Sequence, residues 1–156
     1  MIHEVQINQM HRADWDFVSK IYKEGIETGL ATFEKEILSW EKWDKNHLKT
    51  CRLIAILDYK IIGWAALSAV SSRYVYGGVA EVSVYIAKKA WGNKVGEKLM
   101  LALIKESEKE GLWTLQAGIF SNNLSSIELH KKVGFRIIGF REKIGQLDGE
   151  WKEEAK

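Results

Sequence analysis

Apolar residues recur every three or four positions in four segments of the chain, which is the spacing of one face of an α-helix. In the first segment, Asp14 can cap a helix whose apolar positions start at Trp15, and Gly29 ends the pattern. In the second, Trp40 and Trp43 fall on one stripe. The predicted helices span residues 15–29, 34–48, 95–110 and 123–133.

Shorter apolar segments favour strands, because they alternate with polar residues or run through several aliphatic side chains. Residues 53–57 and 61–70 flank a three-residue turn and are typical of a hairpin of buried strands. In residues 79–86, valine and isoleucine share one face, so Glu81 is presented from the other. The predicted strands span residues 3–8, 53–57, 61–70, 79–86, 112–120 and 134–146, with a weak last strand from residue 150.

The order of these elements predicts the class of fold. Neighbouring strands followed by alternating helices and strands indicate a mixed sheet with helices on both faces, which is an α/β layer sandwich. No repeat, linker or low-complexity segment divides the 156 residues, so we predict one domain over residues 1–156.

Composition excludes several classes of protein. Hydrophobic residues make up 46% of the chain and charged residues 28%, which argues against a disordered or fibrous protein. The net charge of +2 comes from interleaved charges and does not favour nucleic acid as a partner. Cys51 is the only cysteine, and no apolar run approaches the roughly 18 residues of a membrane span. We therefore expect a cytoplasmic protein with no metal and no membrane partner.

A glycine-containing turn at residues 91–96, WGNKVG, leads into the clearest predicted helix. Backbone N–H groups at a helix N-terminus, together with the helix dipole, can hold a phosphate or pyrophosphate. An ordinary strand-to-helix turn explains the same residues. The segment is not a dinucleotide-binding fingerprint, because the G-x-G-x-x-G spacing is absent.

The residues around this turn resemble the GNAT superfamily of acetyl-CoA-dependent N-acetyltransferases, through EVSVYI at 81–86, IFSNNLSS at 119–126 and LHKKVGF at 129–135. Further segments are similar to its phosphinothricin acetyltransferase branch: ATFE at 31–34, WEKWD at 40–44, GWAAL at 63–67 and RYVYGGVAE at 73–81. Members of this branch N-acetylate amino acids that carry a second anionic or tetrahedral group. The resemblance covers most of the chain and implies a GNAT-like sandwich whose central mixed sheet splays open.

For the co-substrate, the resemblance implies that acetyl-CoA binds where the sheet splays. Its thioester and pantetheine would pair with the backbone of Val84, Tyr85 and Ile86 like an added strand. Asn123 would contact it from across the cleft. The pyrophosphate would lie on the following amides, those of Gly92, Asn93, Lys94, Val95, Gly96 and Glu97.

Two residues of the turn depart from the family pattern. Trp91 stands where relatives usually have arginine, and Lys94 stands where they usually have a middle glycine. Lys94 returns a positive charge, but its side chain also narrows the loop.

Glu81 is the predicted general base. Its carboxylate would remove a proton from the acceptor's α-ammonium before the nitrogen attacks the thioester, although a plain surface carboxylate also fits this position. His130 lies where many relatives place a tyrosine that protonates the departing thiolate, and a structural histidine is the competing interpretation. Because no serine, cysteine and histidine grouping indicates a covalent intermediate, we predict direct transfer.

Arg73 and Tyr76 precede Glu81 by eight and five residues. The resemblance implies that they bind the acceptor's anionic group, which arginine can hold with two parallel hydrogen bonds. Tyr74 and Phe33 are further candidates for the substrate pocket, with ordinary packing as their alternative.

The end of the sequence differs from the family pattern. Relatives usually continue past the tryptophan corresponding to Trp151 with an alternating apolar strand, whereas residues 152–156 are mostly charged. We therefore expect the last strand to be short or missing.

These observations predict an N-acetyltransferase that moves acetyl from acetyl-CoA to the α-amine of a small amino acid. Phosphinothricin, methionine sulfone and methionine sulfoximine are the candidate acceptors, and the family suggests a homodimer. Acetylation of another amine, such as a polyamine or a protein N-terminus, is one alternative. A non-catalytic acyl-CoA-binding module and a generic nucleotide-phosphate binder are the others.

Overall fold

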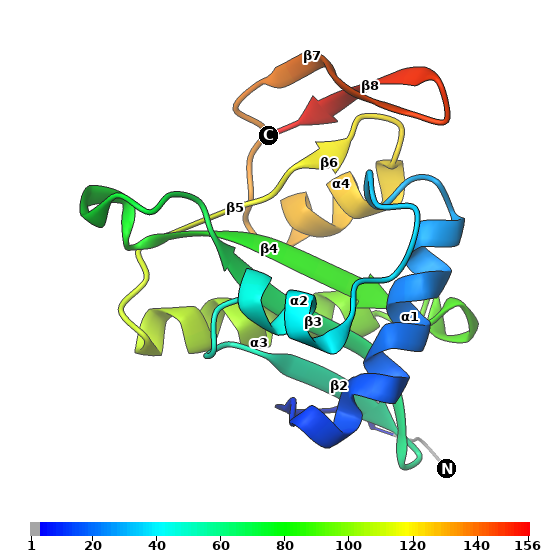
Figure 1. Cartoon of the computed structure of the whole chain (residues 1–156). Coiled ribbons are helices and arrows are strands. Elements are labelled where there is room, and N and C mark those ends of the chain that lie inside the picture. The colour runs from blue at the N-terminus through cyan, green and yellow to red at the C-terminus, as the bar shows by residue number, and fades with distance from the viewer. Residues whose placement is uncertain (1–3) are drawn as a thin grey trace.

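The computed structural model describes residues 4–156, and these residues form a five-stranded and a three-stranded sheet (Figure 1). The large sheet has the order β1 (Gln6–Gln9), β2 (Leu53–Leu57), β3 (Lys60–Ala69), β4 (Val79–Ile86) and β5 (Thr114–Gln116). The small sheet has the order β6 (Ile119–Phe120), β8 (Glu150–Ala155) and β7 (Phe140–Leu147). Paired strands are antiparallel except β4 and β5, which run parallel, so the large sheet is mixed, as predicted.

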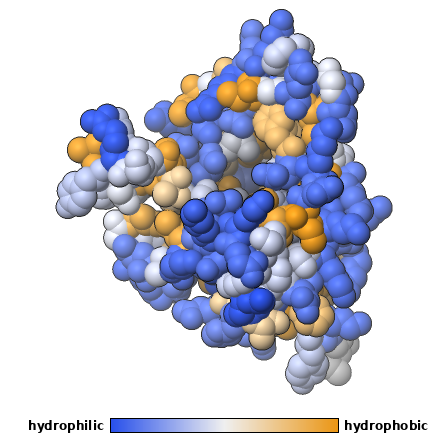
Figure 2. Space-filling view, viewed as in Figure 1, coloured by the Kyte–Doolittle hydropathy of each residue, from blue (hydrophilic) through white to orange (hydrophobic). Residues whose placement is uncertain are grey.

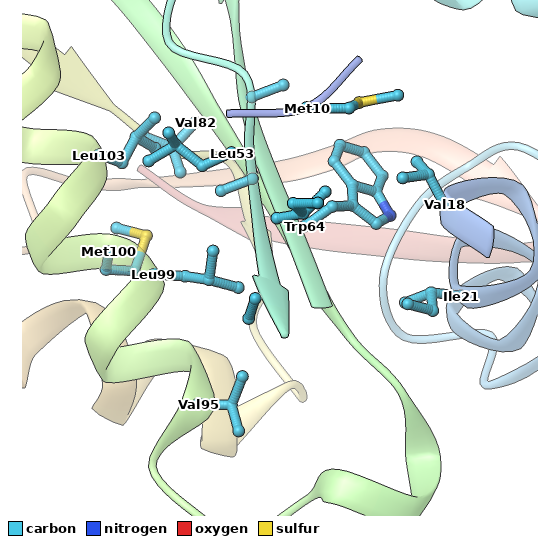
Figure 3. Close-up of a cluster of buried hydrophobic side chains, with 14 of the residues drawn as sticks. Met10, Val18, Ile21, Leu53, Trp64, Val82, Val95, Leu99, Met100 and Leu103 are labelled. Carbon is cyan, nitrogen blue, oxygen red and sulfur yellow. The ribbon is translucent and has the colours of Figure 1, made fainter. Parts of the chain in front are cut away.

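Helices cover both faces of the large sheet. On one face lie α1 (Trp15–Glu27) and α2 (Trp40–Asn46); on the other lies α3 (Val95–Lys109), with α4 (Leu124–Lys132) packed beside it. Figure 3 shows Val18 and Ile21 of α1 reaching the strands from the side opposite Leu99 and Met100 of α3. This arrangement confirms the predicted α/β layer sandwich.

Alternation along β4 decides which side chains face which layer. Val82 joins the buried core with Leu103 of α3 (Figure 3). The ring of Tyr85 instead stacks on Trp64 at 4.9 Å and meets Tyr22 of α1 edge-on. Glu81 lies four residues before Tyr85 and therefore on the same face of β4. Its side chain emerges on the α1 side of the sheet, opposite Val82, as the sequence pattern predicts.

The sheet opens beyond Glu81. β4 pairs with β5 only from Val79 to Glu81, opposite Thr114 to Gln116. The chain then crosses to β6, which belongs to the small sheet. Within the described residues, the rest of β4 therefore has no strand on this edge, and its backbone hydrogen-bonding groups face a gap. The splayed sheet implied by the family resemblance is confirmed.

Two predicted elements are shorter than expected. The helix predicted over 34–48 begins only at Trp40, because the Ser39 hydroxyl accepts a hydrogen bond from the Lys42 N–H at 3.3 Å and caps it there. The strand predicted over 112–120 is divided between β5 and β6, since Ala117 and Gly118 carry the chain from one sheet to the other.

Both predictions about the end of the chain need correction. The strand predicted over 134–146 begins only at Phe140, and the expectation of a short or missing last strand is wrong. β8 has six residues and lies between β6 and β7, so backbone hydrogen bonds hold both of its edges. Its charged side chains form ion pairs instead of packing as an apolar face, with Lys156 bonded to Glu154 and Lys152 to Glu150.

The remaining predicted helices and strands are present with small shifts at their ends. Residue 3 of the first predicted strand lies outside the described residues, and β1 starts at Gln6. Within residues 4–156, no helix combines the length and the apolar character that a membrane crossing requires.

Candidate active site

A polar cleft of about 220 Å³ lies where β4 and the small sheet separate. Its floor is β4, and the loop between α1 and α2, the small sheet and the start of α4 form its walls. The predicted site residues that line it are Phe33, Glu81, Val84, Tyr85, Asn123 and His130.

A larger channel of about 480 Å³ continues from this cleft along the end of β4. The two cavities share the lining residues Val84, Tyr85 and Asn123, so a ligand can extend from one into the other. The channel also holds much of the predicted cofactor set, namely Ile86, Gly92, Lys94, Val95, Gly96 and Glu97. The exception is Asn93, whose side-chain amide donates to the Ala90 carbonyl at 3.3 Å and stays outside the lining.

The turn before α3 has the backbone shape of an anion site. Gly92 has φ of +83° and Lys94 has φ of +61°, both in the left-handed region, and the α3 N-terminus follows directly. A glycine at position 94 in relatives suits this conformation, whereas lysine adopts it at a cost of about 1 kcal/mol. Gly96 instead allows α3 to pack closely against α4, because a Cβ at this position would lie 2.9 Å from the Leu129 side chain.

Trp91 stands at the position of the family's usual arginine, and two lysines lie near it. The Trp91 indole N–H donates to the Ile86 carbonyl at 3.0 Å, and its half-exposed ring lines the channel. Lys94 and Lys132 supply positive charge, and Lys132 also pairs with Glu97 at 3.1 Å. Lys132 escaped the sequence analysis because only the packing of α4 beside α3 brings it to the channel.

Glu81 carries a contact that the sequence does not reveal. The Lys156 ammonium donates to a Glu81 carboxylate oxygen at 2.6 Å and lies 3.5 Å from an oxygen of Glu154. The Glu81 side chain is 37% exposed and that of Lys156 is 14% exposed. The residues are 75 positions apart, so only the register of β8 against the rest of the fold creates the pair.

His130 is buried at the edge of the cleft. Its Nδ1 lies 2.7 Å from the Ser126 carbonyl, which can only accept, and its ring meets Phe135 edge-on. Burial lowers the pKa of His130 below its ordinary value, against a smaller opposing effect of the Ser126 carbonyl. A neutral ring with its proton on Nδ1 has none on Nε2 to give to a thiolate. This arrangement supports the structural interpretation of His130.

Three of the predicted substrate residues lie away from Glu81. Arg73, Tyr74 and Tyr76 belong to the segment between β3 and β4, which projects from the body of the molecule at the left of Figures 1 and 2. The Arg73 guanidinium stacks 5.6 Å from the Tyr76 ring, and Tyr74 is 96% exposed. None of the three lines the cleft. Phe33 does, and it meets Phe120 edge-on at 4.7 Å.

Within residues 4–156, no cluster of three or more histidine, cysteine or acidic side chains is arranged to hold a metal ion. The cleft brings together the Glu81 carboxylate and an unpaired strand edge, and the Lys156 ammonium pairs with that carboxylate from the neighbouring groove. The continuous channel ends at a helix N-terminus with two nearby lysines. This combination suits an extended ligand whose anionic end lies at the helix N-terminus. The other end of the ligand would lie beside the Glu81 carboxylate, which can accept a proton.

Comparison with known proteins gives the same picture. An L-methionine sulfoximine/L-methionine sulfone acetyltransferase of Pseudomonas aeruginosa is 34% identical over 92 residues, which is 59% of this chain and 54% of that protein. The chain thus spans about half the length of that relative. A ribosomal-protein-alanine N-acetyltransferase structure from Brucella melitensis superimposes with a TM-score of 0.89 at 28% identity, over 96% of both chains.

A phosphinothricin acetyltransferase structure from Sinorhizobium meliloti, in complex with acetyl-CoA, has a TM-score of 0.88 at 26% identity, over 97% of this chain and 85% of that one. The family model described as the acetyltransferase (GNAT) family matches residues 9–135. On the strength of this match and of the splayed sheet, the chain belongs to the acetyltransferase (GNAT) family.

Proposed function

We propose that this protein is an N-acetyltransferase that moves acetyl from acetyl-CoA directly to the α-amine of a small amino acid. Methionine sulfone, methionine sulfoximine and phosphinothricin are the proposed acceptors, in keeping with the names of its relatives. The observation that carries the proposal is the position of Glu81. Its carboxylate lines the cleft at the point where β4 loses its neighbour, and Val84, on the same strand, lines both the cleft and the channel.

Acetyl-CoA fits the residues that are present. The open edge of β4 offers the backbone of Val84 and the N–H of Ile86 to the pantetheine, while the Ile86 carbonyl already accepts from the Trp91 indole. The left-handed turn at Lys94 presents N–H groups to the pyrophosphate. Asn123 also caps α4, since its side chain accepts from the Ser126 N–H, and its amide donates to the Leu30 carbonyl at 3.2 Å. Acetyl-CoA supplies the activated acyl group of the reaction.

The chain's own residues then account for the transfer. Glu81 accepts a proton from the acceptor's ammonium, and the freed amine attacks the thioester carbonyl. A backbone N–H on the open edge of β4 stabilises the oxyanion. The carbon–sulfur bond breaks, the second amine proton goes to the thiolate, and the products are the N-acetyl amino acid, CoA thiol and one proton. The substrate roles of Arg73, Tyr74 and Tyr76 stay predictions, because these residues lie outside the cleft.

We also propose one acetyltransferase domain over residues 1–156 and a homodimer in the cytoplasm, where acetyl-CoA is available. Exposed apolar residues gather around a second groove of about 490 Å³, among them Trp113, Ile137 and Ile138. Burying such a surface between two copies is favourable. Light scattering after size-exclusion chromatography tests the dimer, and a monomer mass at all concentrations contradicts it.

A thiol-release assay tests the proposed function. The protein is incubated with acetyl-CoA and either methionine sulfone, phosphinothricin, spermidine or a peptide with N-terminal alanine, and the product is identified by mass spectrometry. We expect release with the amino acids and a product heavier by one acetyl group. Release with spermidine or the peptide alone would favour another amine. Saturable acetyl-CoA binding without release on any amine would indicate a non-catalytic acyl-CoA-binding module.

A further inference from the structure

Lys156 holds a fixed place beside the proposed base. Its backbone N–H donates to the Gly139 carbonyl at 2.9 Å, and its carbonyl accepts from the Ile138 N–H at 2.7 Å. Its ammonium bridges the two sheets, with Glu81 of β4 at 2.6 Å and Glu154 of β8 at 3.5 Å. Because the side chain is only 14% exposed, this is not a solvated surface lysine.

Lys156 reaches Glu81 from the wall between two cavities. It lines the groove beside α4, and that groove shares Ala117, Ile119 and His130 with the cleft. Glu81 lines the cleft, and Lys156 contacts it from the side of the groove, so the ion pair stands in the wall between the two.

The pair brings two cations together when an acceptor binds. Lys156 holds one oxygen of the Glu81 carboxylate, so an acceptor's ammonium on the same carboxylate lies close to the Lys156 ammonium. For an amine without a negative group, the repulsion between this ammonium and a largely buried lysine opposes binding. A free amino acid avoids this penalty, because its own carboxylate can pair with Lys156.

We infer that Lys156 is a specificity-determining residue that selects zwitterionic acceptors. The acceptor enters the Glu81–Lys156 pair as a zwitterion, with its ammonium on Glu81 and its carboxylate on Lys156. The flexible four-carbon side chain of lysine allows the ammonium to move with its new partner. Lys156 thus brings a positive charge to Glu81 at the wall of the cleft, whereas Arg73 lies on the projecting segment. This inference rests on the proposed function.

The test compares methionine sulfone with its carboxamide, which keeps the amine and lacks the negative charge. We expect the wild-type protein to prefer the acid in kcat/KM, and Lys156→Met to reduce the kcat/KM for the acid by about 10- to 100-fold. The amide should lose little or gain, so the acid-to-amide ratio falls towards one. Lys156→Arg keeps the charge and should keep most of the preference.

Lys152→Met is the matched control. Lys152 lies on β8, which ends one residue before Lys156; it is 15% exposed and pairs with Glu150 instead of Glu81, so its loss should leave the acid-to-amide ratio unchanged. An unchanged KM for acetyl-CoA and an unfolding temperature close to that of Lys152→Met show that Lys156→Met is folded. A wild-type acid-to-amide ratio in folded Lys156→Met overturns the inference.

Failure of the proposed function is a separate result, since it appears as a wild-type protein without turnover on any amine. Calorimetric titration with the acid and the amide then makes the same comparison by binding alone. Tighter binding of the acid that disappears in Lys156→Met supports the inference. Equal binding of acid and amide by the wild-type protein overturns it.

Discussion

Replacing Glu81 with glutamine separates proton transfer from the structural use of the same side chain. Glutamine keeps the size of the residue and can still accept a hydrogen bond from Lys156, but it cannot take a proton at neutral pH. Loss of a general base typically lowers turnover by about 10²-fold or more. We expect this loss in kcat for methionine sulfone, with a KM for acetyl-CoA close to that of the wild-type protein.

The effect of this change on stability follows from the exposure of the pair. A fully exposed ion pair contributes about 0–1 kcal/mol, and removing one member of a buried pair costs about 3–5 kcal/mol. Glu81 is 37% exposed and Lys156 keeps a 3.5 Å contact with Glu154, so the expected loss is about 1–2 kcal/mol. For a chain of this length, that corresponds to a fall in Tm of about 2–8 °C.

Continuous thiol release with methionine sulfone measures the turnover, and Glu154→Gln is the control. Glu154 contacts the same lysine and lines the same cleft, but lies on β8 and is not the proposed base. The Glu154→Gln variant should lose stability, but its kcat should fall far less than that of Glu81→Gln. In Glu81→Gln, kcat/KM should rise steadily with pH, since only the deprotonated acceptor reacts. A Glu81→Gln variant with kcat within about threefold of the wild-type value would refute the assignment of the base.

Three further predictions concern the fold and the turn before α3. Lys94→Gly should raise the free energy of unfolding by about 1 kcal/mol, measured by chemical denaturation, because φ is +61° at this position. The same change removes a cation and should raise the KM for acetyl-CoA, measured by steady-state kinetics. Burial lowers the pKa values of His47 and His130, so the free energy of unfolding should fall as pH drops below about 6.5, where the unfolded chain binds the protons. Thermal unfolding should show a weaker dependence of Tm on pH in the variant that carries both His47→Gln and His130→Gln. Gly25→Ala should destabilise the protein by about 1 kcal/mol or more in thermal unfolding, because a Cβ would lie 2.4 Å from the Tyr85 ring, and a wild-type Tm would contradict this.

The parts of the fold that depend on local pattern could be predicted from the sequence. The apolar face of α3 and the hairpin of β2 and β3 are set by residues a few positions apart, so periodicity identifies them. The helix predicted over 34–48 was too long, because a capping residue, Ser39, and not the apolar stripe fixes where α2 begins.

The features that depend on distant strands could not be predicted in this way. Residues 112–120 look like one strand, and only the pairing of β6 with β8 shows that the sheet divides at Gly118. The Lys156–Glu81 pair needs the register of β8, and charged residues in sequence suggested the absence of that strand. The family resemblance pointed to Glu81 and to residues that line the channel, and the substrate role that it implies for Arg73, on the projecting segment, stays a prediction.

Transfer of a labelled acetyl group is the most direct measurement of the central claim. The protein is mixed with acetyl-CoA labelled in its acetyl group and with methionine sulfone, and the label is followed into protein and small molecules. The account predicts label in the α-N-acetyl product in proportion to the CoA thiol released, with none retained on the protein as an acyl intermediate. Label in the product no faster than in a mixture without the protein would contradict it.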